Sequence, residues 1–153
     1  MSKKVLILHT GGTLGMRPQD PDRALAPDEL GTALLEQAPE IGRIAAVEIR
    51  YLYNMDSSDM TPDHWLAFAG EIAGSIADFD GVVITHGTDT MAYTAAALSY
   101  VLRNLPVPVI VTGSQRPLVD ARSDARANLV GAVDLATRDS PEVAIYFDGK
   151  LFR

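Results

Sequence analysis

The sequence predicts an α/β protein of three layers, in which a mostly parallel sheet carries helices on both of its faces. Two observations lead to this fold class. Short, unbroken apolar runs, which are typical of buried parallel strands, alternate with amphipathic segments of helical length along all 153 residues. Two of these runs, at residues 5–8 and 82–84, lead directly into segments rich in glycine and threonine. Open α/β sheets bind their ligands where parallel strands end, so these segments mark a candidate site.

The first half of the chain contains two strands and two helices. The first strand is expected at about residues 4–9, and Asp28 is expected to cap a helix that runs to about Gln37. The second strand, at about 44–52, is rich in β-branched residues. A helix is then expected from Thr61 and Pro62, with an apolar stripe formed by Trp65, Phe68, Ala69, Ile72 and Ile76.

The second half continues the same alternation. Strands are expected at residues 81–85, 107–112 and 143–147, and a helix at about 90–103. Ser123 is expected to cap the last helix, whose inner face would consist of Leu129, Ala132, Val133 and Ala136. Right-handed crossovers would bring all the parallel strand ends to one edge of the sheet.

Composition excludes several classes of protein. Apolar residues make up 47% of the chain and charged residues 22%, as in ordinary globular domains. The net charge of −7 argues against a nucleic-acid partner, which would require a basic face. The chain has no cysteine for disulfides or thiolate metal sites, and no apolar run approaches the length of a signal peptide core or membrane span. We therefore expect a soluble, cytoplasmic protein without membrane contact.

Known nucleotide and hydrolase motifs are absent. Residues 11–15 (GGTLG) do not follow the dinucleotide pattern, and the chain contains neither a P-loop nor a G-x-S-x-G elbow. The three histidines, His9, His64 and His86, form no metal-ligand spacing, so His9 and His86 are expected to be structural hydrogen-bonding residues near strand ends.

Three residues in the two glycine-threonine segments can carry chemistry. The hydroxyls of Thr13 and Thr88, at the ends of two strands, could reach opposite sides of one substrate, and Asp89 could bind a substrate ammonium group. The alternative is that each is a helix N-cap, as threonine and aspartate directly before a helix commonly are.

The proline-rich loop at residues 17–27 lies beside the first of these segments. Two interpretations remain open for it: a lid over the site, or a plain surface connection.

The chain resembles the bacterial L-asparaginase family, most closely its cytoplasmic type I members. The resemblance covers essentially the whole chain. It is carried by residues 10–16 (TGGTLGM), 55–60 (MDSSDM), 86–94 (HGTDTMAYT) and 111–117 (VTGSQRP).

The resemblance implies hydrolysis of L-asparagine, and possibly L-glutamine, to the acid and ammonia, without cofactor or metal. It implies that Thr13 is the nucleophile that forms an acyl-enzyme, with Thr88 and Asp89 as its catalytic partners. The implied substrate-binding residues are Ser57, which holds the α-carboxylate, and Ser58, Gly12, Gly87 and Ser114, the last through its backbone carbonyl. For Ser57 and Ser58, turn formation is an equally good reading. The family also implies a homo-oligomer.

The chain departs from the family pattern at three points. Family members are about twice as long, so residues 1–153 are expected to be their N-terminal domain, incomplete at its C-terminal end and without the second domain. The family's lysine that partners the second threonine falls a few residues beyond Arg153, and Lys150 precedes the expected position. Arg23 stands roughly where the family's loop tyrosine would fall.

Four functional hypotheses follow. The leading one is asparagine hydrolysis by a truncated or naturally short enzyme. Another is an ammonia-releasing component of an amidotransferase, resembling one component of the archaeal glutamyl-tRNA enzyme, although the chain lacks a basic tRNA-facing patch. A third is a domain that binds asparagine or aspartate without efficient turnover. A purely structural domain would leave the paired threonine segments unexplained.

Overall fold

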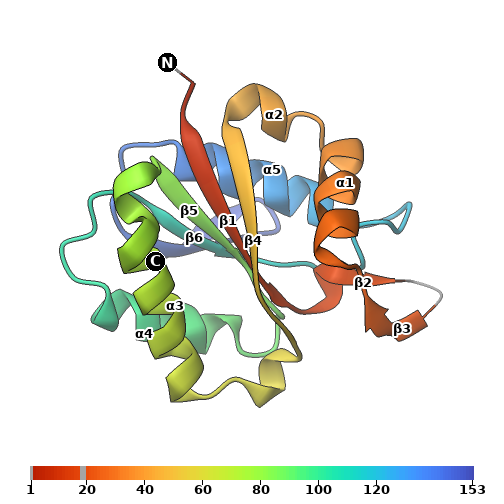
Figure 1. Cartoon of the computed structure of the whole chain (residues 1–153), viewed down its shortest axis with the longest axis horizontal. Helices are drawn as coiled ribbons and strands as arrows, with labels where there is room; N and C mark the ends of the chain where they lie inside the picture. Colours follow the sequence, from red (N-terminus) through yellow and green to blue (C-terminus); the bar gives the residue numbers. More distant parts are fainter. Residues whose placement is uncertain (1, 18–19) are drawn as a thin grey trace.

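A computed structural model of the chain describes residues 2–17 and 20–153, with the backbone alone for residues 20–23. Its main sheet has the strand order β4-β1-β5-β6-β7-β8 (Figure 1). The strands of this sheet are β1 (Lys4–Gly11), β4 (Ala46–Met55), β5 (Gly81–Thr85), β6 (Val109–Thr112), β7 (Val143–Phe147) and β8 (Lys150–Phe152). All neighbouring pairs are parallel except β7 with β8. The expected mostly parallel α/β sheet is confirmed.

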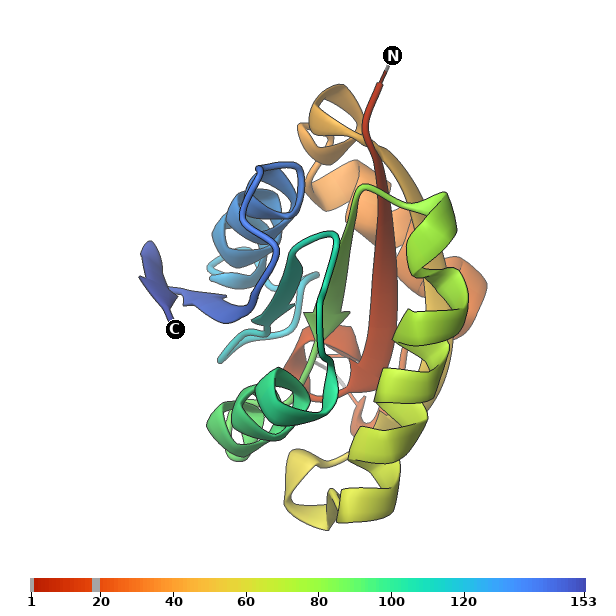
Figure 2. The ribbon, with the colours of Figure 1, turned by 90° about the vertical axis from the view of Figure 1, so that its left-hand side faces the viewer.

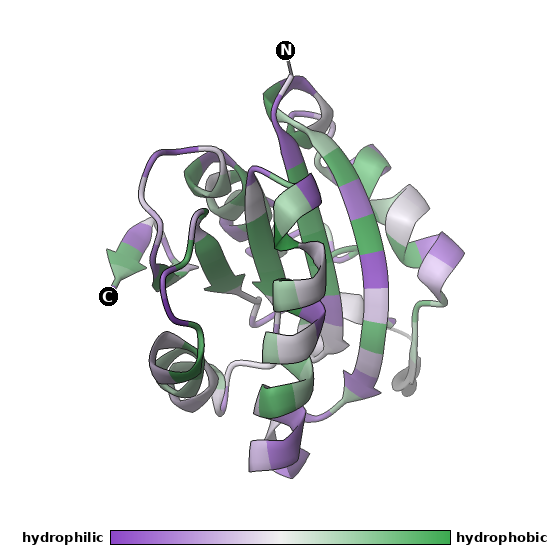
Figure 3. Cartoon of the chain, turned by 60° about the vertical axis from the view of Figure 1, so that its left-hand side comes forward, coloured by the Kyte–Doolittle hydropathy of each residue, from purple (hydrophilic) through white to green (hydrophobic). Residues whose placement is uncertain are grey.

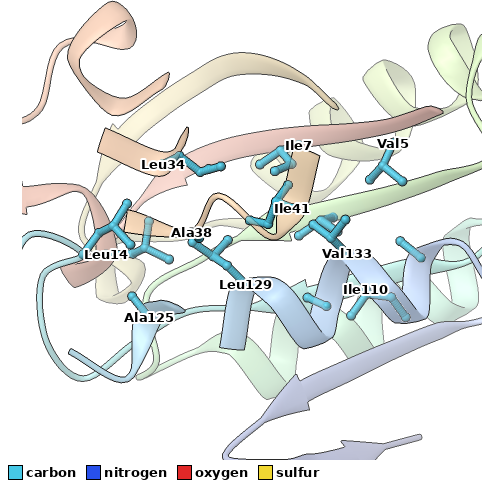
Figure 4. Close-up of a cluster of buried hydrophobic side chains, with 14 of the residues drawn as sticks. Val5, Ile7, Leu14, Leu34, Ala38, Ile41, Ile110, Ala125, Leu129 and Val133 are labelled. Carbon is cyan, nitrogen blue, oxygen red and sulfur yellow. The ribbon is translucent and has the colours of Figure 1, made fainter. Parts of the chain in front are cut away.

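Helices cover both faces of this sheet. The side view shows α5 (Ala125–Ala136) on one side of the strands and α3 (Pro62–Ser75) on the other (Figure 2). The helices α1 (Pro27–Gln37) and α2 (Ile41–Ile44) share a hydrophobic cluster with α5, whereas α4 (Met91–Val101) shares one with α3. Val5 and Ile7 of β1 point toward Ile41, Leu129 and Val133 in the first cluster (Figure 4). Successive residues of a strand face opposite sides, so Leu6 and Leu8 belong to the second cluster.

The hydropathy of the strands matches their place in the sheet. The inner strands β5 and β6 are buried along their whole length and apolar up to a final threonine, as expected for strands covered on both faces (Figure 3). The edge strand β4 alternates between apolar and polar residues along its length (Figure 3). Arg50 of β4 pairs with Glu48 on the same strand and with Glu71 of α3.

Several local predictions need correction. The proline-rich loop forms a small hairpin of β2 (Met16–Arg17) and β3 (Asp20–Ala24), and the short helix α2 was not expected. A second hairpin joins β7 to β8 through Asp148 and Gly149, which have φ values of 50° and 71°. Asp-Gly is a strong signal for a turn with two positive φ angles, so this hairpin was readable from the sequence.

Both expected helix caps are shifted. The helix α1 begins at Pro27 after Ala26, and the Glu29 carboxylate accepts the Ala26 N–H at 2.8 Å, so Asp28 lies within the first turn. The helix α5 begins at Ala125 after Asp124, although the Ser123 hydroxyl still accepts the Ala125 N–H at 3.0 Å. No helix in the described parts of the chain is long and apolar enough to cross a membrane.

The sheet register brings the functional segments together. Gly11 of β1 lies opposite Met55 of β4, and His9 lies opposite Thr85 of β5, which in turn pairs with Thr112 of β6. These parallel strands therefore end at one edge, and the residues that follow each of them meet there.

Candidate active site

A small cavity of about 40 Å³ lies at this edge of the sheet. Six of the eight residues that the sequence predicted for the site line it: Gly12, Thr13, Ser57, Gly87, Thr88 and Asp89. Met16 and Asp56 complete the lining. The structure thus gathers segments following β1, β4 and β5 around one space, whereas Ser58 and Ser114 do not line it.

Two glycines permit the close approach of these segments. A Cβ on Gly12 would lie 2.6 Å from both Cα and N of Gly87, and one on Gly87 would lie 2.7 Å from Oγ of Ser57. Gly12 also has a φ of 80°, a conformation that side chains with a Cβ rarely adopt. The predicted importance of Gly12 and Gly87 thus has a steric basis, since the walls of the cavity touch through positions without a side chain.

The backbone around Thr13 is tightly held. Thr13 begins a 3₁₀ helix, Thr13–Gly15, that follows Gly12 and is closed by a hydrogen bond from Gly15 N–H to Gly12 O of 3.2 Å. Leu118 N–H donates to Leu14 O at 3.0 Å, and Leu25 N–H donates to Gly15 O at 2.7 Å. These bonds tie the turn to the β2–β3 hairpin and to the segment after β6.

The N-cap interpretation is wrong for Thr13, Thr88 and Asp89. Gly12, rather than Thr13, occupies the N-cap position of the first turn, and Thr90 occupies that of α4. Thr88 and Asp89 precede this position, and Asp89 is exposed. Their side chains are therefore left for the cavity rather than for the helix.

The two serines after β4 have different environments. Ser57 is 3% exposed, and its carbonyl accepts a hydrogen bond of 2.7 Å from the Thr90 hydroxyl. Ser58 is exposed, and its backbone N–H and hydroxyl both donate to Asp56 Oδ1, at 2.8 and 2.7 Å. Ser58 therefore forms the turn that the sequence offered as an alternative.

Asp56 and Met16 are the lining residues that the site prediction missed. The hydrogen bonds from the Ser58 N–H and then the Ser58 hydroxyl lower the pKa of the Asp56 carboxyl. Asp56 directly precedes the two predicted serines, and its turn role concealed its place at the cavity. With Asp89 it gives the lining two carboxylates, while none of the described lining residues is a lysine, arginine or histidine.

Both histidines near strand ends are buried hydrogen-bonding residues, which confirms the sequence expectation. His9 Nδ1 lies 2.8 Å from the Thr85 hydroxyl, and burial lowers the pKa of His9 to about 4. A Cβ on Gly15 would lie 2.8 Å from Nε2 of His9, so the Thr13 turn rests on this ring. The described residues contain no group of three or more His, Cys, Asp or Glu side chains placed to hold a metal ion.

Ser114 and Lys150 lie apart from the cavity lining. Ser114 is buried, and its hydroxyl donates to the carbonyl of Arg116. Lys150 lines a separate hollow of about 480 Å³ together with Arg122 and Asp148. The side chain of Arg23, which stands roughly where the family's loop tyrosine would fall, lies outside the described residues.

The fold is that of an α/β protein with a cavity, a candidate ligand site, lined by threonine, aspartate and glycine residues at the carboxyl edge of a parallel sheet. The family model of the asparaginase N-terminal domain matches residues 4–153. The chain belongs to the asparaginase family.

Individual relatives agree with this assignment. L-asparaginase 1 of Escherichia coli K12 is 43% identical over 99% of this chain and 46% of its own length. A component of the glutamyl-tRNA(Gln) amidotransferase of Pyrococcus horikoshii is 44% identical over 95% of this chain and 34% of its own length. The crystal structure of L-asparaginase I from Vibrio cholerae superposes with a TM-score of 0.89 at 43% identity, over all of this chain and 47% of that one. The chain thus spans less than half the length of these relatives.

Proposed function

We propose that the protein is an amidohydrolase that converts L-asparagine and water to L-aspartate and ammonia through an ester on Thr13. The observation that carries the proposal is the meeting of the Thr13 and Thr88 segments with Ser57 and Asp89 around one cavity. The family relatives named L-asparaginase support the choice of reaction.

In the proposed reaction, the Thr13 hydroxyl oxygen attacks the side-chain amide carbon of the substrate. The carbon–nitrogen bond breaks, and ammonia leaves with the proton that the hydroxyl gives up. Water then attacks the ester carbon, which releases aspartate and returns a proton to Thr13. The N–H of Thr88 has no acceptor among the described residues, and it is a candidate donor to the oxygen that becomes negative during attack.

The charges of the lining support an amino-acid substrate. Asp56 and Asp89 supply carboxylates for an ammonium group, and the lowered pKa of Asp56 keeps it ionised at neutral pH. We propose that Ser57 holds the substrate carboxylate through hydrogen bonds, since no cationic side chain lies among the described lining residues. We favour asparagine over glutamine because of the similarity to L-asparaginases, although one methylene contributes only about 1–3 kcal/mol to discrimination.

A second candidate is binding of asparagine or aspartate without efficient turnover. The described lining residues include no lysine or histidine that could take the proton from Thr13. Loss of a general base slows a reaction by about 10²–10⁴-fold. The resemblance places the family's lysine beyond Arg153, so the activity of these 153 residues is the quantity to measure.

The amidotransferase alternative rests on similarity to the Pyrococcus horikoshii protein. That relative is as similar to the chain as the asparaginases are, and ammonia release would be common to both. The net charge of −7 disfavours a tRNA-facing surface, so we retain free amide hydrolysis as the first proposal.

We infer a cytoplasmic homo-oligomer. A structural neighbour from Campylobacter jejuni, 33% identical, is described as a probable cytoplasmic L-asparaginase. The helix α4 carries no charged residue and exposes Tyr93 and Tyr100 by 68% and 79%, which suits an interface between copies of an acidic chain.

The test is ammonia release from L-asparagine by the purified protein beside Thr13→Ala and Thr13→Ser. We expect Thr13→Ala to lose at least about 10³-fold in rate, and Thr13→Ser to retain part of it because it keeps the hydroxyl. Calorimetry with L-aspartate is run in parallel. Binding without ammonia release would favour the second candidate, and undiminished release by Thr13→Ala would refute the proposed nucleophile.

A further inference from the structure

Three side chains behind the cavity form a continuous chain of hydrogen bonds that ends on the Gly87 carbonyl. The Trp65 indole N–H, from α3, donates to the Thr94 hydroxyl oxygen of α4 at 3.0 Å. The same oxygen lies 2.9 Å from Nε2 of His86, and Nδ1 of His86 lies 2.7 Å from the carbonyl oxygen of Gly87. The three side chains are referred to below as the relay.

The chemistry of the end groups fixes the direction of every hydrogen bond in the relay. A carbonyl oxygen only accepts, so Nδ1 of His86 must carry the ring proton. Nε2 then accepts from the Thr94 hydroxyl, and the Thr94 oxygen accepts from the indole, which only donates. Every group in the relay is thereby satisfied by a neutral His86.

The surroundings of His86 keep it neutral and enclosed. His86 is 1% exposed and Thr94 is fully buried, and the Phe68 ring lies edge-on to His86 with 6.4 Å between centroids. Burial lowers the pKa of His86, and this effect is larger than the opposing one of the hydrogen bond to the Gly87 carbonyl, which raises it. The hydrogen bonds of His86 are therefore shielded from water that would otherwise compete for them, whereas the Trp65 indole is partly buried.

The relay holds the carbonyl of a glycine, the residue type whose backbone is least restricted. Gly87 has no side chain, so its backbone dihedrals are less restricted than those of other residues. The bond between Gly87 and Thr88 is trans, as are all described peptide bonds, and the carbonyl and the N–H of a trans peptide point in opposite directions. With the Gly87 carbonyl held toward His86, the Thr88 N–H points away from His86, and both residues line the cavity.

We propose that Thr94 and Trp65 are positioning residues, which act through His86 to hold the Gly87–Thr88 peptide so that the Thr88 N–H faces a ligand oxygen in the cavity. Neither residue lines the cavity, and each acts only through the relay. The inference rests on the proposed function for the identity of the ligand, whereas the orientation of the peptide is a property of the chain.

The test compares four variants of the full protein. Thr94→Val keeps the branched shape but removes the hydroxyl, and Thr94→Ser restores the hydroxyl. Trp65→Phe removes the indole donor together with part of the ring volume that packs against the second hydrophobic cluster. Thr32→Val is the control, because Thr32 is a helical threonine of α1 whose hydroxyl donates at 3.0 Å to Asp28 O on the surface.

Two kinds of measurement are made. Nitrogen NMR of His86 reports which ring nitrogen is protonated, and the amide proton of Thr88 is followed during titration with L-aspartate. Ammonia release gives kcat and KM for asparagine. The tautomer measurement requires no ligand, and the Thr88 measurement requires ligand binding but no turnover.

We expect the Nδ1–H tautomer in the wild type and a downfield shift of the Thr88 amide on aspartate binding. Thr94→Val should reduce that shift and lower kcat about tenfold with KM within about twofold, since loss of one buried hydrogen-bond partner costs on the order of a factor of ten. Thr94→Ser should recover most of the rate, Trp65→Phe should show a smaller loss, and Thr32→Val should match the wild type.

Different failures separate the two proposals. An Nε2–H tautomer in the wild type, an unmoved Thr88 amide with aspartate bound, or an unchanged kcat in Thr94→Val would overturn the relay while leaving the hydrolase intact. Binding with the expected Thr88 shift but without ammonia release would support the relay and refute hydrolysis. Absence of both binding and release would overturn both proposals.

Discussion

The hydroxyl of Thr90 donates a hydrogen bond of 2.7 Å to the backbone carbonyl of Ser57. This bond joins the segment after β5 to the segment after β4, both of which contribute to the cavity lining. It lies beside the contact between Gly87 and the Ser57 side chain, where a Cβ would have no room. The position of Ser57 in the cavity thus depends on both Thr90 and Gly87.

Replacing Thr90 by valine should loosen Ser57 while keeping the branched shape of the side chain. Loss of one neutral hydrogen bond costs about 1 kcal/mol, so we expect KM for asparagine to rise about fivefold with a smaller change in kcat. Steady-state ammonia release measures both quantities. Thr137→Val is the matched control, because its hydroxyl also donates at 2.7 Å to a backbone carbonyl, that of Asp134 near the end of α5. Equal changes in KM for the two variants would contradict a specific role for Thr90.

The contact between Gly12 and Gly87 gives a second prediction. An alanine at position 12 would place its Cβ 2.6 Å from backbone atoms of Gly87, and it would also hold a φ of 80°. We expect Gly12→Ala to abolish ammonia release and to destabilise the fold by several kcal/mol, that is by more than the roughly 1–2 kcal/mol typical of backbone strain alone. Urea unfolding measures the stability.

Gly149→Ala separates the two effects at position 12. Gly149 also has a positive φ, of 71°, but nothing lies within 4 Å of the added Cβ. This control should lose only about 1–2 kcal/mol, the cost of the left-handed conformation, and should keep its activity. If Gly12→Ala were no more harmful than Gly149→Ala, the close approach of the two segments would not matter to the site.

The regular elements could be predicted because their signals are local. The apolar runs of β5 and β6 and the stripe of α3 depend on residues near one another in the chain, and all three were found. The residues after β1 and β5 that the sequence singles out do lie around one cavity, and they could be singled out because glycine and threonine at the end of an apolar run are a local pattern. The turn at Asp148 and Gly149 has an equally local signal in its Asp-Gly pair.

The missed features depend on contacts between distant segments. Asp56 reads as a turn residue in sequence, and only the approach of the β1 and β5 segments makes it part of the cavity lining. The relay joins Trp65 to His86 through Thr94, three positions whose spacing in the chain has no recognisable pattern. Ser58 makes the local turn bonds that its sequence context predicts and does not line the cavity, so its implied contact with substrate stays a prediction.

Buried His9 predicts how stability depends on pH. Burial lowers the pKa of His9 from 6.5 to about 4, so the folded state favours the neutral ring. The contribution of His9 to the free energy of unfolding is therefore fully present above pH 6.5 and decreases as the pH falls toward 4. In this range His9 binds a proton in the unfolded chain but stays neutral in the folded protein. At about 1.4 kcal/mol per pKa unit, the free energy of unfolding should fall by about 3 kcal/mol between about pH 7 and pH 4 from this residue.

Urea unfolding at a series of pH values measures this contribution. The lowered pKa values of His86, from burial, and of Asp56 and Asp80, from hydrogen bonding, change stability in the same direction, so the wild-type slope alone does not isolate His9. His9→Asn can keep a hydrogen bond to Thr85 near the place of Nδ1, but it has no group that titrates in this range. We expect the unfolding free energy of His9→Asn to fall less steeply between pH 6.5 and 4, by the amount assigned to His9. His64→Gln, which replaces a histidine at the start of α3, is the control and should keep the His9 contribution. If His9→Asn and the wild type lost stability in parallel, folded His9 would take up a proton as readily as it does in the unfolded chain. Protonated Nε2 would then need a hydrogen-bond acceptor, which its contact with Gly15 does not provide.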